Sequence, residues 1–238
     1  MPGEGGCETL CPKTLHLKSI HDPGDIAVAA GLEFAEARNW SRLLVAAESG
    51  DVEALGSELA AGADINQADE DGWSALHLAA HSGRIAVLET LIGHPAIDVN
   101  SRNKWKSTPL SLAAAKGHFA CILALVKHKQ IDIDARADYY GRTPLIEAAR
   151  NGHLDIVKLL VEYGADVNRA DKTGRNSALI EAIKGRHYAV ADYLLGTRKV
   201  NFLNKDMRLN ALIWAGSARN AELIEKLDAA IHAFFEGK

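Results

Sequence analysis

The feature that most constrains this chain is a leucine that recurs at nearly constant spacing. The aligned leucines are Leu43, Leu76, Leu110, Leu145, Leu179 and Leu212, so successive copies lie 33, 34, 35, 34 and 33 residues apart. A period of roughly 20 to 50 residues is typical of repeat proteins, in which each copy is one supersecondary unit. Ordering one such unit costs on the order of 50 kcal/mol, at about 1.5 kcal/mol per residue, and two short helices bury too little apolar area to offset that cost. The units are therefore expected to be stable only when stacked.

The copy around Leu145 shows what each unit contains. Thr143 precedes Pro144, and a capping hydroxyl followed by proline at the first helical position predicts the start of a helix. Gly152 lies seven residues after the aligned leucine and is suited to the left-handed conformation that ends a helix. A second apolar helix follows, and the Gly-Ala-Asp-Val-Asn run at 164–168 leads into an extended hairpin loop.

Capping residue, proline, leucine, alanine pair, glycine and final asparagine recur together in register, and this pattern resembles the ankyrin repeat. The resemblance covers roughly residues 39 to 235. It implies an all-α solenoid of about six helix-turn-helix units with hairpin finger loops. We expect an N-terminal extension over residues 1–36 and a repeat domain over 37–235, with units near 39–69, 70–102, 103–137, 138–171, 172–204 and 205–235.

The first and last copies depart from the pattern and are expected to be terminal caps. The first has Ser57 and Glu58 where the fourth has Leu159 and Leu160. This difference predicts an N-terminal cap with a polar outer face. The sixth copy lacks both the proline and the glycine, which leaves the start of its first helix open.

Composition and charge bear on the class of protein. Lys and Arg number 27 against 31 Asp and Glu, so the net charge of -4 gives no overall attraction to nucleic acid or acidic lipid. No apolar run approaches the roughly 20 residues that span a bilayer, and the first residues do not resemble a signal peptide. Three cysteines are too few for a disulfide framework. We therefore expect a cytoplasmic protein; the nucleus or a cytoskeletal or ciliary assembly also fits.

Catalysis and cofactors are not expected. The chain lacks the His-Glu-x-x-His and Gly-x-Ser-x-Gly motifs and has no phosphate-binding glycine loop. Five of its ten histidines fall at or beside recurring positions, and in the ankyrin family such histidines bond loop backbone or cap helices; they are His77, His81, His118, His153 and His187. Asn66, Asn100 and Asn168 are likewise expected to brace hairpin turns, although asparagines of this kind can be hydroxylated in the family, and Asn168 fits that pattern best.

One alternative is a zinc-dependent nucleic-acid binder that uses Cys7, Cys11, His16 and His21. Thiolates and imidazoles are good zinc ligands, and four of them could close a tetrahedral site. The spacing comes close to that of a zinc knuckle. The first gap is one residue too long, however, and the last ligand would be histidine instead of cysteine. We therefore expect no metal and favour a solvated tail.

The resemblance implies that function lies on the concave face, in the groove formed by the finger tips and the first helices. The expected partner-binding residues occupy outward positions of the fingers and helices; they are Trp73, Trp105, Lys116, Tyr139, Tyr140, Arg142 and Arg150. The same positions in the last two copies are Thr173, Asn176, Lys184, Met207 and Leu209. Trp, Tyr and Arg dominate interface hot spots, so these residues suggest binding. The alternative is that the rings pack on neighbouring fingers.

Basic side chains predominate along this surface after Glu70 and Asp71. The gradient predicts a protein partner with an acidic segment and apolar anchors. No small-molecule substrate or membrane is expected, and nucleic acid is disfavoured by the net charge. The predicted function is a non-catalytic protein-binding scaffold, adaptor or subunit of a larger assembly. A regulatory inhibitor or an assembly chaperone would use the same surface.

Overall fold

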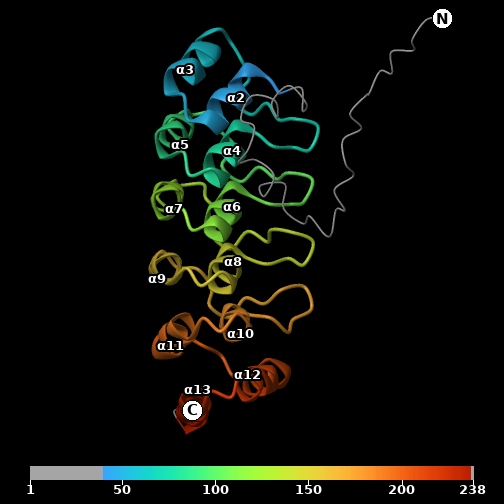
Figure 1. Ribbon diagram of the computed structural model, residues 1–238, viewed down its shortest axis with the longest axis vertical. Coiled ribbons are helices and arrows are strands. Elements are labelled where there is room, and N and C mark those ends of the chain that lie inside the picture. Colours follow the sequence, from blue (N-terminus) through green and yellow to red (C-terminus); the bar gives the residue numbers. More distant parts are fainter. Residues whose placement is uncertain (1–39, 237–238) are drawn as a thin grey trace, which may run out of the picture.

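The computed structural model describes residues 40–236, and this part of the chain contains twelve helices joined by short turns and longer loops (Figure 1). The helices are α2 (Arg42–Ser49), α3 (Val52–Ala60), α4 (Ala75–His81), α5 (Ile85–Ile92), α6 (Pro109–Lys116), α7 (Phe119–Val126), α8 (Pro144–Arg150), α9 (Leu154–Glu162), α10 (Ala178–Lys184), α11 (Tyr188–Gly196), α12 (Lys205–Ser217) and α13 (Ala221–Glu236). The expected extension over residues 1–36, with Cys7, Cys11, His16 and His21, lies outside the described residues.

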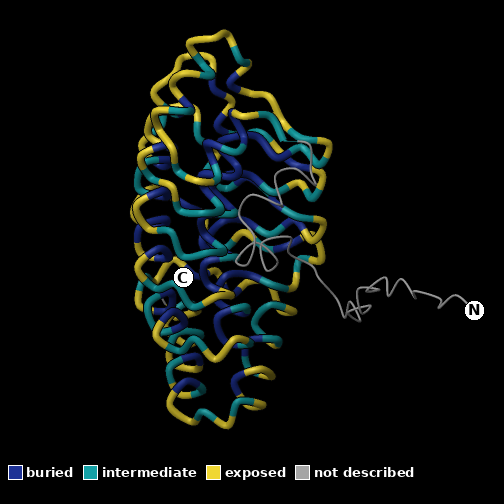
Figure 2. Tube along the Cα trace, turned by 45° about the horizontal axis from the view of Figure 1, so that its top comes forward, coloured by how far each residue is buried: buried dark blue, intermediate teal, exposed yellow. Residues whose placement is uncertain are grey.

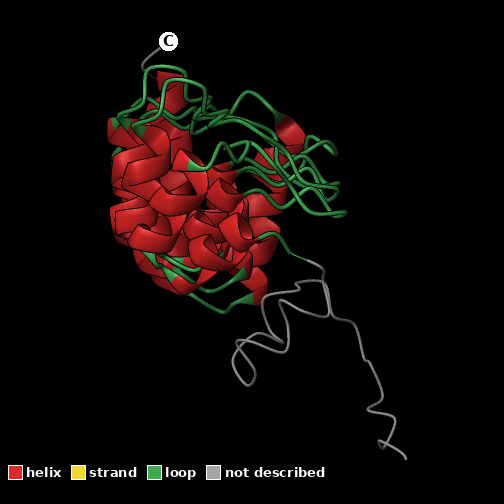
Figure 3. Ribbon diagram, turned by 90° about the horizontal axis from the view of Figure 1, so that it is seen from above, coloured by secondary structure: helices red, strands yellow, loops and turns green. Residues whose placement is uncertain are grey.

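The helices form two stacked columns. The first helix of each pair packs on the first helix of the next pair, from α2 through α12, and the second helices pack in the same way from α3 to α13. Figure 3 shows the loops gathered on one side of the helices, where they form the fingers. Among the described residues no β-strand is present, and three isolated bridges such as Ala68 to Ser74 close the fingers. The expected all-α solenoid is therefore confirmed.

The core runs continuously between the two columns (Figure 2). The aligned leucines of the first five copies are at most 3% exposed. The alanine pairs beside them, such as Ala113 and Ala114, are also buried, which lets neighbouring helices approach closely. The sixth leucine, Leu212, is only half-buried because it lies at the end of the stack. Each unit thus completes the core of its neighbour.

Helix starts follow the predicted capping chemistry. The side chain of Thr108 accepts a hydrogen bond from the backbone N–H of Ser111, and Thr143 does the same for Ile146. Ser74 caps α4 in the same way, and Nδ1 of His77 lies 2.8 Å from the Ser74 hydroxyl. These bonds satisfy backbone donors that a helix start would otherwise leave free.

Histidines and glycines interlock adjacent turns. Nε2 of His118 lies 2.8 Å from the carbonyl oxygen of His81, and Nε2 of His153 lies 3.2 Å from that of Ala115. The rings lie on glycines of the preceding copy: a Cβ atom added at Gly117 would come within 2.8 Å of the His153 ring, and Gly117 has a positive φ of 83°. The structural role expected for these histidines is confirmed for His77, His118 and His153.

The recurring asparagines brace successive loops. Asn168 donates to the carbonyl oxygen of Lys199 at 2.9 Å, and its own side-chain oxygen accepts from the N–H of Asn201. Asn66 makes the equivalent bonds to Ala96 and Asp98. Each of these asparagine side chains therefore binds one backbone carbonyl oxygen and one backbone N–H of the next copy's loop.

The sixth copy differs from the expectation because it has no finger. Helix α12 begins at Lys205, directly after Asn204, whose side chain accepts from the N–H groups of Asp206 and Met207. Met207 and Leu209 therefore lie on a helix, and the finger positions predicted for them are wrong. The other fingers turn at a residue with positive φ, for example Gly72 or Gly141, and no residue from 199 to 218 has one. Without that turn the capped segment continues as helix.

Candidate protein-binding surface

Four fingers, at residues 69–73, 103–107, 138–142 and 171–176, form the finger edge of the molecule. An acidic or amide side chain at the start of each finger bonds backbone N–H groups across its turn, as Asp69 does for Asp71 and Trp73. Neighbouring fingers are also tied together: the N–H of Lys104 donates to the carbonyl of Asp71, and the N–H of Lys172 donates to the carbonyl of Tyr140, both at 2.8 Å. The finger edge is thus a fixed platform.

Tyr139 and Tyr140 are the exposed aromatic residues of this edge, at 60% and 57% exposure. The Tyr139 hydroxyl donates to the carbonyl of Lys104 at 3.1 Å, so the ring is held across the gap between two fingers. The Arg142 guanidinium lies 5.0 Å from the centre of the Tyr140 ring. Both rings keep a large accessible area although their positions are constrained.

Trp73 contradicts the expectation of an exposed anchor, because it is only 3% exposed. Its ring centroid lies 5.4 Å from that of His81 and 6.4 Å from that of Trp105, in edge-to-face arrangements. The physical reason is that Trp73 lies three residues before the aligned leucine, where the finger returns to the helix. There the backbone N–H of Trp73 donates to the side chain of Asp69. Trp105 is half-buried against it. The alternative of rings packing on neighbouring fingers is correct for Trp73.

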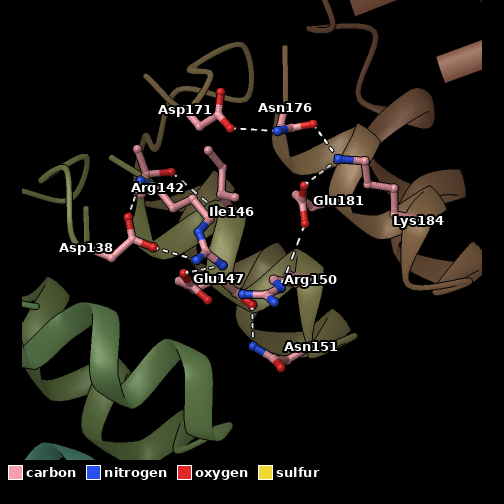
Figure 4. Close-up of polar contacts among 11 residues, drawn as sticks. Asp138, Arg142, Ile146, Glu147, Arg150, Asn151, Asp171, Asn176, Glu181 and Lys184 are labelled. Carbon is pink, nitrogen blue, oxygen red and sulfur yellow. Dashed lines mark hydrogen bonds and ion pairs between the residues drawn. The ribbon is translucent and has the colours of Figure 1, made fainter. Parts of the chain in front are cut away.

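Arg142 occupies the same position in the fourth copy and is also turned inward. Its guanidinium pairs with Asp138 at 2.7 Å and Glu147 at 3.1 Å, and its side chain is 13% exposed (Figure 4). The expectation of a free cation is therefore wrong here. Lys116, in the third copy, is half-buried.

The remaining cations of the groove take part in a chain of polar contacts between the fourth and fifth copies (Figure 4). Arg150 and Lys184 both pair with Glu181, at 3.9 Å and 3.1 Å. Lys184 also donates to Asn176, which donates to Asp171. Arg150 keeps a side-chain exposure of 51%. The floor of the groove here is a set of paired charges and not a basic trough.

Glu147 and Glu181 were not among the predicted site residues. Both lie two positions after the aligned leucine, and the full column at that position is Val45, Leu78, Leu112, Glu147, Glu181 and Trp214. Their shared position in the repeat was the signal by which the sequence could have identified these two glutamates. Burial raises the pKa of Glu147, and the nearby Arg142 partly opposes that rise.

The column divides the groove into two parts. In the second and third copies it holds the buried Leu78 and the half-buried Leu112, whereas in the fourth and fifth it holds the two glutamates. Trp214 on α12 follows them at 42% exposure, and the Lys184 ammonium lies 5.4 Å from its ring centre. The column is therefore apolar in the second and third copies and charged in the fourth and fifth.

Other kinds of site find little support among residues 40–236. No group of three or more His, Cys, Asp or Glu side chains in this range is placed to hold a metal ion. None of the helices described there combines the length and apolar character needed to cross a membrane. Two open surface depressions lie on the outer helix column, one beside Phe119 and Leu159 and the other beside Tyr193 and Lys199, away from the groove.

Comparison with known proteins identifies the family. Residues 15–103 and 95–171 match the family model described as ankyrin repeats (3 copies). The two matches overlap and together cover well over half of the 238 residues. No curated protein matches the chain. Ankyrin repeats are generally protein–protein interaction modules. From the model match and the stacked helix pairs, we conclude that this chain belongs to the ankyrin repeat family.

Proposed function

We propose that this protein is a non-catalytic scaffold, an adaptor or subunit of a larger assembly, that binds a partner polypeptide through its groove and finger edge. The observation that carries the proposal is the exposed tyrosine pair, Tyr139 and Tyr140, on a finger that is tied to both neighbours. Rigid aromatic side chains bury a large area at low entropic cost, and they dominate binding surfaces for that reason. We place the protein in the cytoplasm, where the buried thiol of Cys121 would stay reduced.

We further propose that the partner presents an acidic segment with apolar anchors. The cations of the groove floor are already paired, so the attraction must come from the finger edge. Lys106, Lys172 and Arg175 are exposed there, and Lys104 remains 61% exposed although it pairs with Asp71 at 3.0 Å. The exposed acidic residue of this edge is Glu70. An acidic segment that follows this edge would place its anchors on Tyr139, Tyr140 and Trp105, with Arg150 as a further contact.

The first experiment compares a double variant at the finger edge with a single variant that removes an exposed tyrosine elsewhere. Tyr139→Ala with Tyr140→Ala removes the proposed anchors, whereas Tyr163→Ala removes a 40% exposed ring at the end of α9, outside the groove. Tagged proteins are recovered from native extract and the co-purifying chains are quantified by mass spectrometry. We expect the tyrosine pair variant to lose the partners that wild type and Tyr163→Ala retain, with unchanged circular dichroism. Equal recovery by all three proteins would refute the groove assignment.

The second experiment tests the chemistry of the partner with defined probes. Two labelled peptides of about a dozen residues carry the same leucines, separated by glutamate in one and glutamine in the other. Fluorescence anisotropy is followed at about 50 mM and about 300 mM salt, where screening lengths differ more than twofold. We expect the glutamate peptide to bind more tightly, and to lose that advantage at high salt. Equal affinities of the two peptides at low salt would be compatible with binding in the groove but would refute the preference for an acidic partner.

A further inference from the structure

Exposed aliphatic side chains are concentrated at one end of the molecule. Every exposed leucine or isoleucine among the described residues lies between 203 and 213: Leu203, Leu209 and Ile213, at 59%, 51% and 53% exposure. Leu209 and Ile213 belong to the last unit, which lacks a finger, and Leu203 lies in the segment directly before it. The terminal unit of a solenoid ordinarily needs a polar outer face to remain soluble. This end therefore has the character of an interface.

Three residues of α12 form what we call the terminal stripe: Leu209, Ile213 and Gly216. Their spacing of four and three residues places them on one face of the helix. Ala211 and Ala215, which are buried, mark the face of α12 that is turned toward the rest of the stack, where α12 contacts α10 and α13. At 100° per residue the stripe lies on roughly the opposite side. It therefore points away from the stack, where a further unit would pack.

Gly216 occupies the second position of the recurring alanine pair, at which Ala80, Ala114 and Ala149 are buried in the earlier copies. Glycine inside a helix is less favourable than alanine. A Cβ atom at position 216 would meet nothing within 4 Å, and its backbone is not among the positive-φ positions. A glycine next to two exposed aliphatic residues is suited to the close approach of another backbone.

The opposite end of the stack has a different chemistry, which decides the occupant. At that end α2 is the first helix on which α12 of another copy would stack, and its exposed residues are Arg42 and Ser49. The exposed residues of α3 are mostly polar or small, with Val52 at 37% as the one large apolar side chain. Head-to-tail stacking of two copies would place the terminal stripe against this polar end. Tail-to-tail pairing instead places the stripe against itself, as an isologous dimer requires.

Charges at the two ends of α12 are consistent with such pairing. Asp206 lies in its first turn, and Arg219 follows its last residue; both are exposed. In an antiparallel pair each Asp206 would lie near the Arg219 of the other copy. Antiparallel helices also bring opposite ends of their macrodipoles together.

We propose that two copies of this chain associate tail-to-tail through the terminal stripe on α12. A helix of 13 residues is about 20 Å long and about 10 Å wide, so it covers about 200 Å² on each copy. Stable interfaces bury about 800 Å² per partner. The association is therefore weak and is populated at tens of micromolar or above. It does not depend on the groove.

The test is sedimentation velocity on the full chain from about 5 µM to about 200 µM. We expect the wild-type mass to rise toward that of two chains with concentration. Leu209→Asp with Ile213→Asp should stay monomeric throughout. Val52→Asp, a matched change at the opposite end, should associate like wild type, and so should the Tyr139→Ala and Tyr140→Ala variant. Circular dichroism confirms that each variant is folded.

Several results would overturn the proposal. Wild type that remains monomeric at about 200 µM has no such interface. Loss of association in Val52→Asp would indicate head-to-tail stacking, as would growth beyond two copies. If the double aspartate variant does not fold, Gly216→Gln decides: a Cβ atom at this position meets nothing within 4 Å, so we expect a folded protein with at least tenfold weaker association. Unchanged association in that variant would refute close approach at the terminal stripe.

Discussion

Acid should weaken this protein through a single buried imidazole, that of His77. The side chain is 0% exposed, and its Nε2 lies 3.1 Å from the carbonyl oxygen of Ser107 in the next copy. Burial lowers the pKa of His77 from 6.5 to about 4, although the backbone carbonyls around it act in the opposite direction. The folded protein therefore favours the neutral ring, whereas the unfolded chain accepts the proton more readily.

The sign of the effect follows from proton binding. Between pH 6.5 and 4 the unfolded chain holds a proton on His77 that the folded protein lacks, so stability falls as the pH drops through this window. The full difference between a pKa of 6.5 and one of about 4 corresponds to about 3 kcal/mol. At pH 5 most of it is already lost, about 2 kcal/mol.

The assay is urea unfolding of wild type and His77→Ser at pH 7 and pH 5. Serine occupies the equivalent position in the third copy, where Ser111 forms a capping box with Thr108, so the variant keeps a capping partner for Ser74. Acid effects of all other groups are common to both proteins and cancel in the comparison. We expect the stability advantage of wild type to shrink by about 2 kcal/mol between the two pH values. An equal loss in both proteins would refute the reasoning.

Two further predictions concern packing and backbone conformation. Leu145→Ala removes a side chain that is 1% exposed in a central unit and should lower the free energy of unfolding by about 2 to 5 kcal/mol, measured by urea titration; an unchanged midpoint would contradict the assigned core. Gly117→Ala should destabilise by more than about 1 kcal/mol, because φ is 83° and the new methyl group meets the His153 ring. Gly56→Ala, where α3 leaves open space, should instead stabilise by about 0.5 to 1 kcal/mol. If the melting temperatures of both glycine variants shift in the same direction, the predicted difference between the two sites is wrong.

The sequence was sufficient to predict the repeated helix starts, the helix ends and the stacking of the units. The spacing of the aligned leucines, the caps at Thr108 and Thr143, and the glycines at 117 and 152 each correspond to observed structure. These features are local, and each is confirmed by its recurrence. A residue that caps, turns or fills a gap in one copy has the same surroundings in the next, so the pattern carries the geometry.

The candidate site was predicted less well because its side chains are not repeated. Trp73 and Arg142 share one position, yet one is buried against aromatic rings and the other pairs with two carboxylates. Both were expected to face outward, since the turn of the finger back toward its helix is not evident from spacing alone. Glu147 and Glu181 were missed for the same reason, because their role depends on which cations turn inward to pair with them.

The sixth unit shows how far a repeat can be extrapolated. Its aligned leucine predicted a finger before it, but each of the other fingers turns at a residue with positive φ, and no residue from Lys205 to Arg208 has one. The helix therefore begins early, and its length of 13 residues, against seven to nine in α2 to α11, follows from the missing turn. Leu209 and Ile213 lie on this longer helix, on a face that no segment within residues 40–236 covers. The absence of a single turn thus determines both the end of the groove and the exposed apolar surface on which tail-to-tail pairing depends.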